Sequence, residues 1–435
     1  MSYKRIYDPV HRFIEINPYE DLLIRSGPFE RLRYIHQCGA TFFVYPGATH
    51  KRFEHSLGVM HVATMIYETL INHVEREVFE NSETLYLLDA IPKKGTYAYT
   101  YWKQILRFAS LCHDIGHLPF SHVAEKMLLK EDDHEHWTYK IIMSSYMDPV
   151  FAAFEKQAKN QGMERSVKED VAKVALGPKN YLPNSIFSPF ESALASILIG
   201  DFFGADRIDY LLRDAQQTGL SYGQFDYHQL IQMLRFIPVN KAGEHCIDLG
   251  ILENGLESCE SLLLARHFMF KKIYNYPRVK AYEFHLARFI QKSFSRITSS
   301  IHSYLDTSDI EVLYAIKKAK QDPSHIAHFD ALCLKGGADP FKAIVLPFAL
   351  THDHLIEFQN KYNIKESDIS WSISPLAGQY MAMNMPIIHP DKKISFIPRT
   401  SSVQIPSIER SWLYLSNAHQ DNFSTFSQRA IPEVV

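Results

Sequence analysis

The chain has 435 residues, of which 46% are hydrophobic, and a chain of this length can bury one large core or two smaller ones. Its 46 Lys and Arg nearly balance its 49 Asp and Glu, and the net charge of −3 excludes the strongly basic field of a general nucleic-acid binder. Five cysteines without a CxxC pair, no signal peptide and no apolar run of roughly 20 residues lead us to expect a cytoplasmic protein without a membrane span.

The predicted elements begin with a short β-hairpin, since the stretches KRIY and RFIEI flank a turn at Pro9. From about residue 19 the apolar residues recur every three or four positions, which indicates amphipathic helices. The first of these breaks at Gly27 and Pro28, a long helix follows over 55–77, and another over 102–117 is expected to end at Pro119.

The segment 193–219 predicts two further helices, with a break near Gly204. A small hairpin over 245–255 and a helix over 256–276 complete a mainly helical region, which we predict as one domain over residues 1–300. Strand-like segments at 341–350 and 393–399 lie between Pro-rich turns, so residues 301–435 are expected to form a smaller mixed α/β region. The predicted fold class is mainly α with short β-hairpins.

A metal-ligand pattern lies in LCHDIGHLPFSH, residues 111–122. His113 and Asp114 are adjacent, and His117 follows His113 by one helical turn, so the two imidazoles would share a helix face. A hydrogen-bonded histidine beside a surface aspartate is the ordinary interpretation of an isolated pair. Here the neighbours are apolar, and an unpaired Asp114 would cost several kcal/mol, which a divalent cation held by imidazole and carboxylate would offset.

Further ligands would come from distant helices. His55 stands in a packing helix beside Gly58, whose missing side chain allows close approach of another helix. The stretch GADRIDYLLRDA supplies Asp206 on a polar stripe with Tyr210, Arg213 and Asp214. Taken alone, that stripe also fits a solvated helix face with internal salt bridges.

The segments RFEHSLGV, LCHDIGHLPFSH and DRIDYLLRD, in this order, resemble the HD-domain phosphohydrolases. More narrowly they resemble the deoxynucleoside triphosphate (dNTP) triphosphohydrolases, including the vertebrate sterile-alpha-motif and HD-domain enzyme and bacterial dGTPase-like relatives, over about the first 280 residues. The resemblance implies an HD-domain helical core. It also implies one divalent metal ion, with Mn, Fe, Co or Zn better suited than Mg to nitrogen and oxygen donors, and it assigns as ligands His55, His113, Asp114 and Asp206.

The same resemblance implies the catalytic residues. His122 would be the general acid for the departing 5′ oxygen, while His117, His134 and Glu135 would position water or relay protons. Glu125 stands where the vertebrate enzyme has an aspartate partner for that acid.

Substrate contacts follow in the same way. Arg52, Arg207 and Arg266 match positions that contact phosphates or sugar, although a surface position also explains each arginine alone. The residues matching the deoxyribose-binding pattern are Gln37, Tyr210, Asp214 and Tyr274. At the substrate site, three positions depart from the vertebrate pattern: Arg207 replaces a lysine, Cys38 a leucine and Phe270 a histidine.

The resemblance thus implies metal-dependent hydrolysis of a dNTP to deoxynucleoside and inorganic triphosphate. Hydrolysis of another nucleotide or a phosphodiester is the first alternative, since one fold hosts several reactions, and a nucleotide-binding module without turnover is the second. The family pattern also implies a homo-oligomer, in the vertebrate case a tetramer activated by nucleotides. Lys4 and Arg33 match that activating site, whereas Tyr7 and Glu30 replace its amide side chains, which argues against guanine-nucleotide activation.

Overall fold

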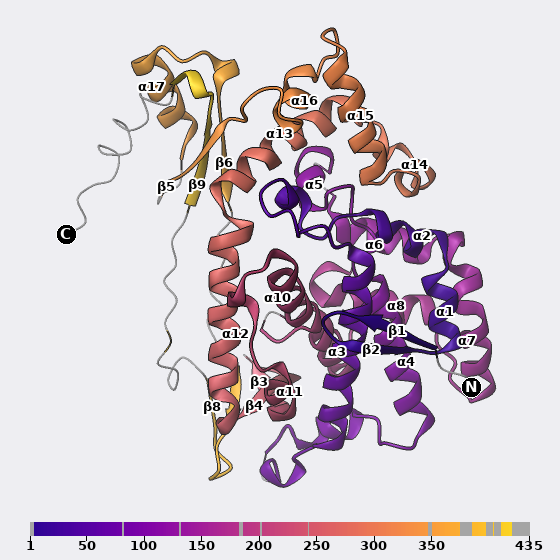
Figure 1. The fold of residues 1–435 in the computed structure, drawn as a ribbon. Coiled ribbons are helices and arrows are strands. Elements are labelled where there is room, and N and C mark those ends of the chain that lie inside the picture. Colours follow the sequence, from indigo (N-terminus) through magenta and orange to yellow (C-terminus); the bar gives the residue numbers. More distant parts are fainter. Residues whose placement is uncertain are drawn as a thin grey trace.

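The computed structural model describes residues 4–80, 82–129, 132–181, 186–200, 202–241, 243–346, 350–374, 385–396, 403 and 410–419. Helices make up most of the molecule, and the strands form three small sheets (Figure 1). The predicted fold class, mainly α with a smaller mixed region near the C-terminus, is confirmed.

The N-terminal hairpin is present as β1 (Lys4–Asp8) and β2 (Arg12–Ile16), paired antiparallel. Asn17 and Glu20 then form a capping box at the start of α1 (Pro18–Ile24), which satisfies backbone N–H groups that have no partner inside the helix. The predicted break at Gly27 is also confirmed, because Gly27 begins the separate short helix α2 (Gly27–Glu30).

The centre of the molecule is α3 (Arg52–Asn72), which packs against α4 (Tyr97–Cys112) on one side and α10 (Ala205–Thr218) on another (Figure 1). Most of α3 is buried, as expected for a helix surrounded by other helices. Gly58 permits the contact with α10, since a Cβ atom there would lie 1.9 Å from Asp209 Oδ1. The approach of these two helices brings their polar residues together.

The helix expected to run to Pro119 ends earlier, at Cys112. Residues 113–116 form a turn, followed by α5 (His122–Leu128) and α6 (His134–Met143). Gly116 packs against α6, where a Cβ would lie 2.2 Å from the carbonyl oxygen of His134. The prediction that His113 and His117 share a helix face is therefore wrong, because tertiary contact with α6 replaces the last helical turn.

The remaining helices of this part surround α4 and α10. They include α7 (Asp148–Asn160), α8 (Val167–Asn180) and α9 (Pro189–Ile199), and α8 packs against both α4 and α9. The predicted break near Gly204 is confirmed, as it separates α9 from α10. The helix predicted to end before Pro277 is also found, as α12 (Leu256–Met269) with a π-helical turn over Phe270–Tyr274.

A four-stranded sheet joins distant parts of the chain. The predicted hairpin begins earlier than residue 245, as β3 (Leu234–Lys241) and β4 (Glu244–Leu252), after α11 (Tyr227–Met233). β7 (Pro386–Ile388) pairs parallel with β4, and β8 (Ile394–Phe396) completes the order β3-β4-β7-β8. The C-terminal region thus returns to the opposite end of the molecule (Figure 1).

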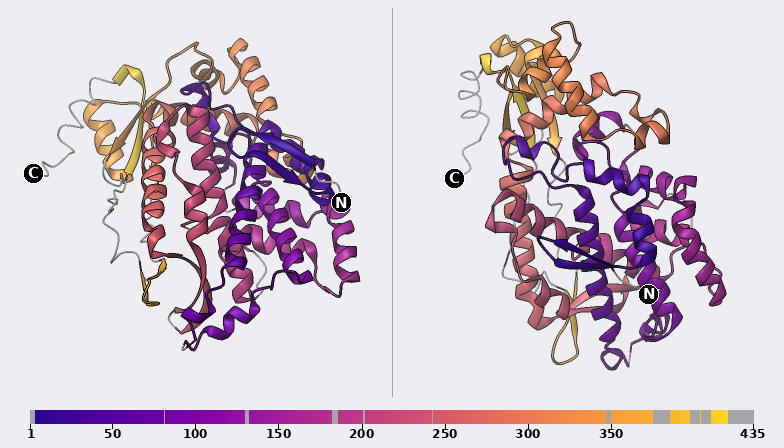
Figure 2. Two further views of the ribbon diagram at one scale, coloured as in Figure 1. Left: turned by 60° about the horizontal axis from the view of Figure 1, so that its bottom comes forward. Right: turned by 45° about the vertical axis from the view of Figure 1, so that its right-hand side comes forward.

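The second part of the C-terminal region follows α13 (Pro277–Ser293) and the helices α14 (Ile301–Leu305), α15 (Asp309–Gln321) and α16 (His328–Leu334). Its sheet has the order β5-β9-β6, from β5 (Lys342–Leu346), β9 (Arg410–Leu415) and β6 (Ile369–Ser374), with α17 (His352–Tyr362) beside it. β5 packs on α13, and the turned views show this sheet at one end of the helical body (Figure 2).

The hydrophobic core extends beyond residue 300. Tyr304, Ile316 and Ile387 belong to the main core, while Leu355 and Leu415 belong to a small separate cluster. The division of the chain at residue 300 stays a prediction.

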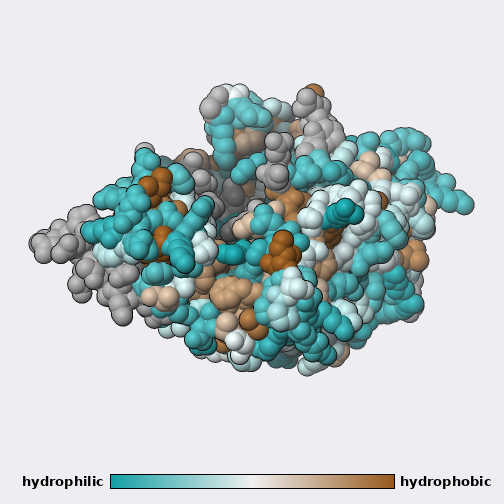
Figure 3. Space-filling model, turned by 90° about the horizontal axis from the view of Figure 1, so that it is seen from above, coloured by the Kyte–Doolittle hydropathy of each residue, from teal (hydrophilic) through white to brown (hydrophobic). Residues whose placement is uncertain are grey.

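The surface seen from above is largely hydrophilic, with hydrophobic side chains in small patches (Figure 3). Within the described residues, no helix combines the length and the apolar character needed to cross a membrane.

Candidate active site

Two histidines and two aspartates from three separate segments meet beside the N-terminal end of α3. His55 Nε2 lies 3.0 Å from Asp206 Oδ1 and 3.4 Å from Asp114 Oδ2. His113 Nε2 lies 3.4 Å from Asp114 Oδ1 and 3.5 Å from Asp206 Oδ1. The four side chains predicted as metal ligands are thus brought together, with both imidazoles presenting Nε2 to the same two carboxylates.

The other nitrogen of each imidazole is fixed by a neighbour. His55 Nδ1 donates to Asp209 Oδ2 at 2.7 Å, and His113 Nδ1 donates to the carbonyl oxygen of Ser110 at 2.7 Å. These bonds leave Nε2 of both rings directed at the two carboxylates and available to a cation. His113 Nε2 is buried and has no hydrogen-bond partner among the described residues, so the donor set fits a divalent cation.

Charge in this group is shared between the carboxylates and their neighbours. Burial raises the pKa of Asp114, but the Arg52 guanidinium and the histidines around it outweigh burial and hold that pKa well below its usual range. Burial lowers the pKa of His55, yet hydrogen bonds to Asp206 and Asp209 and nearby carboxylate charges raise it to about 10. The site therefore holds excess negative charge. The imidazoles offset this charge when no metal ion is bound, and a bound cation would offset it more directly.

Asp209 supports His55 from behind and was not predicted from the sequence. It is fully buried, accepts from His11 Nε2 at 2.7 Å, and pairs with Arg213, which also reaches Asp8 at 2.8 Å. The stretch DRIDYLLRD places Asp209 on the α10 face toward α3. Helical periodicity, together with the small Gly58 on α3, is the sequence signal from which Asp209 could have been predicted.

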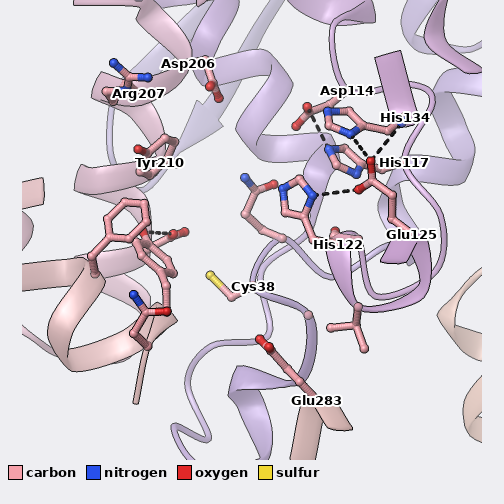
Figure 4. A pocket seen from close by; sticks show the side chains of 18 of the residues that line it. Cys38, Asp114, His117, His122, Glu125, His134, Asp206, Arg207, Tyr210 and Glu283 are labelled. Atoms are coloured by element: carbon pink, nitrogen blue, oxygen red, sulfur yellow. Dashed lines mark hydrogen bonds and ion pairs between the residues drawn. The ribbon is translucent and has the colours of Figure 1, made fainter. Parts of the chain in front are cut away.

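A second cluster adjoins the first and contains His117, His122, Glu125 and His134. Glu125 Oε2 is 2.8 Å from His122 Nδ1, and Glu125 Oε1 is 2.7 Å from His134 Nδ1 (Figure 4). The rings of His117 and His134 stack with centroids 3.9 Å apart, and His117 Nε2 lies 3.4 Å from Asp114 Oδ1. A continuous chain of contacts therefore runs from Asp114 to His122, in which the link between His117 and His134 is a stack of their rings.

The protonation states in this cluster are polarised. Burial raises the pKa of Glu125, but its hydrogen bonds with His122 and His134 outweigh burial and put the pKa far below its usual range. Burial, Arg52 and His134 lower the pKa of His117, whereas Glu125 raises that of His134 against the effect of burial. Near neutral pH the cluster thus contains an ionised Glu125, a neutral His117 and a more basic His134.

Glu135 lies at the edge of this cluster. Its Oε2 is 3.2 Å from His134 Nδ1, and its Oε1 accepts weakly from Asn180 Nδ2 at 3.5 Å. Burial raises the pKa of Glu135. It does not line the cavity described next, so its contact with the site runs through His134.

Both clusters open into one large cavity of about 1350 Å³. Its walls include all seven predicted substrate-binding residues: Gln37, Arg52, Arg207, Tyr210, Asp214, Arg266 and Tyr274. Figure 4 shows Asp206, Arg207 and Tyr210 on the side opposite His122 and Glu125. The cavity is also lined by Trp371 and Tyr414 of the C-terminal sheet, which the sequence did not associate with the site.

Arg52 lines the cavity and also contacts the cluster of His55, His113, Asp114 and Asp206. It is buried, its Nη1 is paired with Asp114 Oδ2, and its Nε donates to Ser121 Oγ at 2.8 Å. Ser121 Oγ in turn donates to the carbonyl oxygen of His36 at 2.9 Å. The guanidinium is therefore held in place beside Asp114, rather than extended into solvent.

The far end of the cavity is built around Asp214. Its Oδ2 accepts from the Tyr274 hydroxyl at 2.6 Å, and its Oδ1 lies 2.6 Å from His50 Nε2. Phe270 packs edge-on against the Tyr274 ring, and the Arg266 guanidinium lies 5.1 Å from the Phe270 ring centroid. The phenyl ring thus packs against both the Tyr274 ring and the Arg266 guanidinium.

Residues 52–153 match the HD domain family. An uncharacterised protein of Methanocaldococcus jannaschii is 30% identical over 311 residues, which cover 71% of this chain and 54% of that protein. The deoxynucleoside triphosphate triphosphohydrolase SAMHD1 of Danio rerio is 28% identical over 252 residues, 55% of this chain and 37% of that enzyme. This chain thus spans about half or less of the length of these curated relatives.

A crystal structure of a hypothetical protein from Aquifex aeolicus matches with a TM-score of 0.72 and 25% identity, covering 99% of this chain and 100% of the other. The fold is therefore shared over nearly the whole length of both chains. Residues 52–153 thus contain an HD domain, and the family match, the relatives and the shared fold support an HD-domain, dNTPase-like family for this chain.

Proposed function

We propose that the protein is a metal-dependent hydrolase that converts a dNTP into the deoxynucleoside and inorganic triphosphate. One observation carries this proposal, namely that three groups of side chains meet at a single cavity. They are the His and Asp cluster around Asp114 and Asp206, the His and Glu cluster around Glu125, and three arginines together with the Asp214 and Tyr274 pair. The arrangement is supported by the similarity to SAMHD1, whose name describes this reaction in that protein.

We assign the metal to His55, His113, Asp114 and Asp206, since these side chains offer two imidazole nitrogens and two carboxylates at one point. A bound divalent cation would polarise the phosphoryl group and lower the pKa of a water molecule there. Arg52 keeps Asp114 oriented by its ion pair, and Asp209 keeps His55 in the tautomer that exposes Nε2.

His122 is the residue assigned to protonate the departing 5′ oxygen. Its side chain is 64% exposed in the cavity, and its Nδ1 is bonded to Glu125, which leaves Nε2 to carry the proton. Loss of hydration, with the charges of His134 and Arg52, lowers the pKa of His122, whereas the hydrogen bond and negative charge of Glu125 oppose that shift and favour the protonated imidazole. We assign His134 to position Glu125 through the hydrogen bond between them, and His117 to position His134 through their stacked rings.

A triphosphate brings several negative charges into a site that already contains carboxylates, so cationic side chains must face it. Arg207 and Arg266 line the same cavity as Arg52 and are assigned to the phosphates. At the other end, Asp214 and Tyr274 are joined by a 2.6 Å hydrogen bond, and we assign this pair to the 3′ hydroxyl of the deoxyribose, with Gln37 and Tyr210 beside it.

Product analysis tests the reaction. With Mn²⁺, the purified protein should release deoxynucleoside and triphosphate from a dNTP in one step, and Asp206→Ala should lose both bound metal and turnover. Primary formation of dNDP or dNMP would reject the assignment, and turnover confined to cyclic nucleotides or single-stranded DNA would favour a diesterase. Metal and nucleotide binding without any turnover would identify a binding module.

A further inference from the structure

A third group of side chains of the types that bind metals lies apart from the two already described. It consists of Cys38, His50 and Asp214. They come from distant segments: Cys38 precedes the 3₁₀ turn Gly39–Phe43, His50 precedes α3, and Asp214 lies in the last turns of α10. Asp214 follows Asp206 by eight residues, so the two carboxylates are separated by about 12 Å along the helix. The group is therefore a separate place in the fold.

The three donor atoms already lie close together. His50 Nε2 is 2.6 Å from Asp214 Oδ1 and 3.7 Å from Cys38 Sγ, and all three atoms are within 4.8 Å of one another. Zinc bonds of about 2.0 Å to nitrogen and 2.3 Å to sulfur at a tetrahedral angle place those two atoms about 3.5 Å apart. The sulfur and nitrogen are thus near the required spacing, and the nitrogen to oxygen distance must open by less than about 1 Å.

The group is enclosed on the protein side and open on the other. His50 and Asp214 are buried, while Cys38 is half-buried and lines the cavity, where Figure 4 shows its sulfur directed into the open space. None of the five cysteines, all of which the structure describes, is in a disulfide, so the Cys38 thiol is available. A cation held here would keep its fourth coordination position toward the cavity.

Asp214 is already oriented by a neighbour, since the Tyr274 hydroxyl donates to Oδ2 and leaves Oδ1 toward His50. Carboxylate ligands in metal sites are commonly held by such a second hydrogen bond. The leucine of the vertebrate pattern at position 38 offers no donor atom, so the third ligand comes from a position at which this chain departs from that pattern.

We propose that Cys38, His50 and Asp214 bind Zn²⁺, and that this ion inhibits the protein by occupying the sugar end of the cavity. A mixed sulfur, nitrogen and oxygen donor set favours Zn²⁺ over Mg²⁺ or Ca²⁺. The inhibition rests on the proposed function, because Asp214 and Tyr274 are assigned there to the deoxyribose. The binding itself does not depend on that assignment.

Binding requires the thiolate of Cys38, and the thiol proton is released to the solvent as the metal to sulfur bond forms. Burial and the charge of Asp214 raise the pKa of the Cys38 thiol well above its usual value.

Titration of the full chain with Co²⁺ in place of Zn²⁺ tests the site directly. Thiolate coordination to Co²⁺ produces a charge-transfer absorption band in the near ultraviolet. The proposed metal site at His55, His113, Asp114 and Asp206 does not generate this band, because its ligands carry only nitrogen and oxygen. We expect this band in the wild type, its loss in Cys38→Ser, and its displacement by Zn²⁺. Cys246→Ser, which removes another half-buried cysteine outside the cavity, is the matched control and should retain the band.

Further variants separate ligand roles from general damage. His50→Ala should weaken Zn²⁺ binding by at least about tenfold, and Tyr274→Phe, which removes only the outer hydrogen bond, by about tenfold. Thermal unfolding should show that each variant is folded. Absence of the band in folded wild-type protein, or its persistence in Cys38→Ser, would overturn the proposed site.

Inhibition is measured on its own. Excess Mn²⁺ is added first to fill the proposed metal site at His55, His113, Asp114 and Asp206. Micromolar Zn²⁺ should then raise KM for the dNTP in the wild type and in Cys246→Ser, but not in Cys38→Ser. A protein that shows the Cys38-dependent band without dNTP turnover would keep the zinc site and lose the proposed function. Turnover that Zn²⁺ leaves unchanged despite the band would overturn the inhibitory role.

Discussion

Glu125 bonds two histidines at once, His122 through Oε2 at 2.8 Å and His134 through Oε1 at 2.7 Å. The vertebrate pattern has an aspartate at this position, so the longer side chain was an open point in the sequence. Glu125 lies in α5 three residues after His122, and His134 begins α6 nine residues further on, so one carboxylate contacts both rings. The proposed proton relay is thus joined across a helix boundary by a single side chain.

Substitution Glu125→Gln should reduce kcat by about 100-fold or more, since the amide keeps the shape but cannot stabilise a protonated His122. Bound metal should be unchanged, because Glu125 is not among the assigned ligands. Steady-state kinetics and metal analysis measure the two effects. Glu155→Gln, on the surface of α7, is the control expected to match wild type. An unaltered kcat in Glu125→Gln would remove this residue from the relay.

Asp209→Asn should weaken metal binding by about 10- to 100-fold, because the amide no longer sets the tautomer of His55. It should also destabilise the fold by roughly 3 kcal/mol, since Arg213 would lose one of its two buried carboxylate partners. Metal content and denaturant unfolding report these separately. Asp89→Asn breaks only an exposed ion pair with Arg76 and should change neither. Wild-type metal affinity in Asp209→Asn would show that His55 is oriented by other contacts.

Gly58→Ala should destabilise the protein by roughly 2 kcal/mol or more. The added Cβ would lie 1.9 Å from Asp209 Oδ1 and 2.4 Å from Arg213 Nη2, so α3 and α10 must separate or the buried ion pair must move. Urea unfolding and metal affinity should both decline. Gly27→Ala meets no atom within 4 Å and serves as the control. A Gly58→Ala variant as stable as wild type would mean that the helix contact yields easily.

Stability should fall between pH 7 and pH 5 through His61. Burial, the charge of His11 and the charge of Arg107 lower the pKa of His61 in the folded protein to about 4, against about 6.5 for an unperturbed histidine. Between these values the unfolded chain binds the extra proton and the folded chain does not, so acid favours unfolding by roughly 1 to 2 kcal/mol at pH 5.

The measurement is urea unfolding at pH 7, 6 and 5 for wild type and His61→Gln. The variant should lose part of the wild-type decline between pH 7 and pH 5, because glutamine does not titrate. Equal declines in the two proteins would assign this pH dependence to other groups.

Much of the architecture could be predicted from local pattern. Apolar residues at helical spacing predicted α3, α10 and α12, and the breaks at Gly27 and Gly204 were visible because glycine and proline interrupt helices. The motifs around His55, His113 and Asp206 also predicted side chains that would meet, and the structure brings them together. Periodicity and residue chemistry are properties of short segments, so one sequence displays them directly.

Other features depended on which segments pack together. The helix with Cys112 ends before the histidine motif because Gly116 contacts α6, and β7 joins β4 although some 130 residues separate them along the chain. The support of His55 by Asp209, and the approach of Cys38 to His50 and Asp214, likewise depend on how α10 lies against the segments before and within α3. Local pattern decides what each segment can form and which donors it carries, whereas the packing of a shared core decides which donors meet, since that choice is set by side chains distant in the sequence.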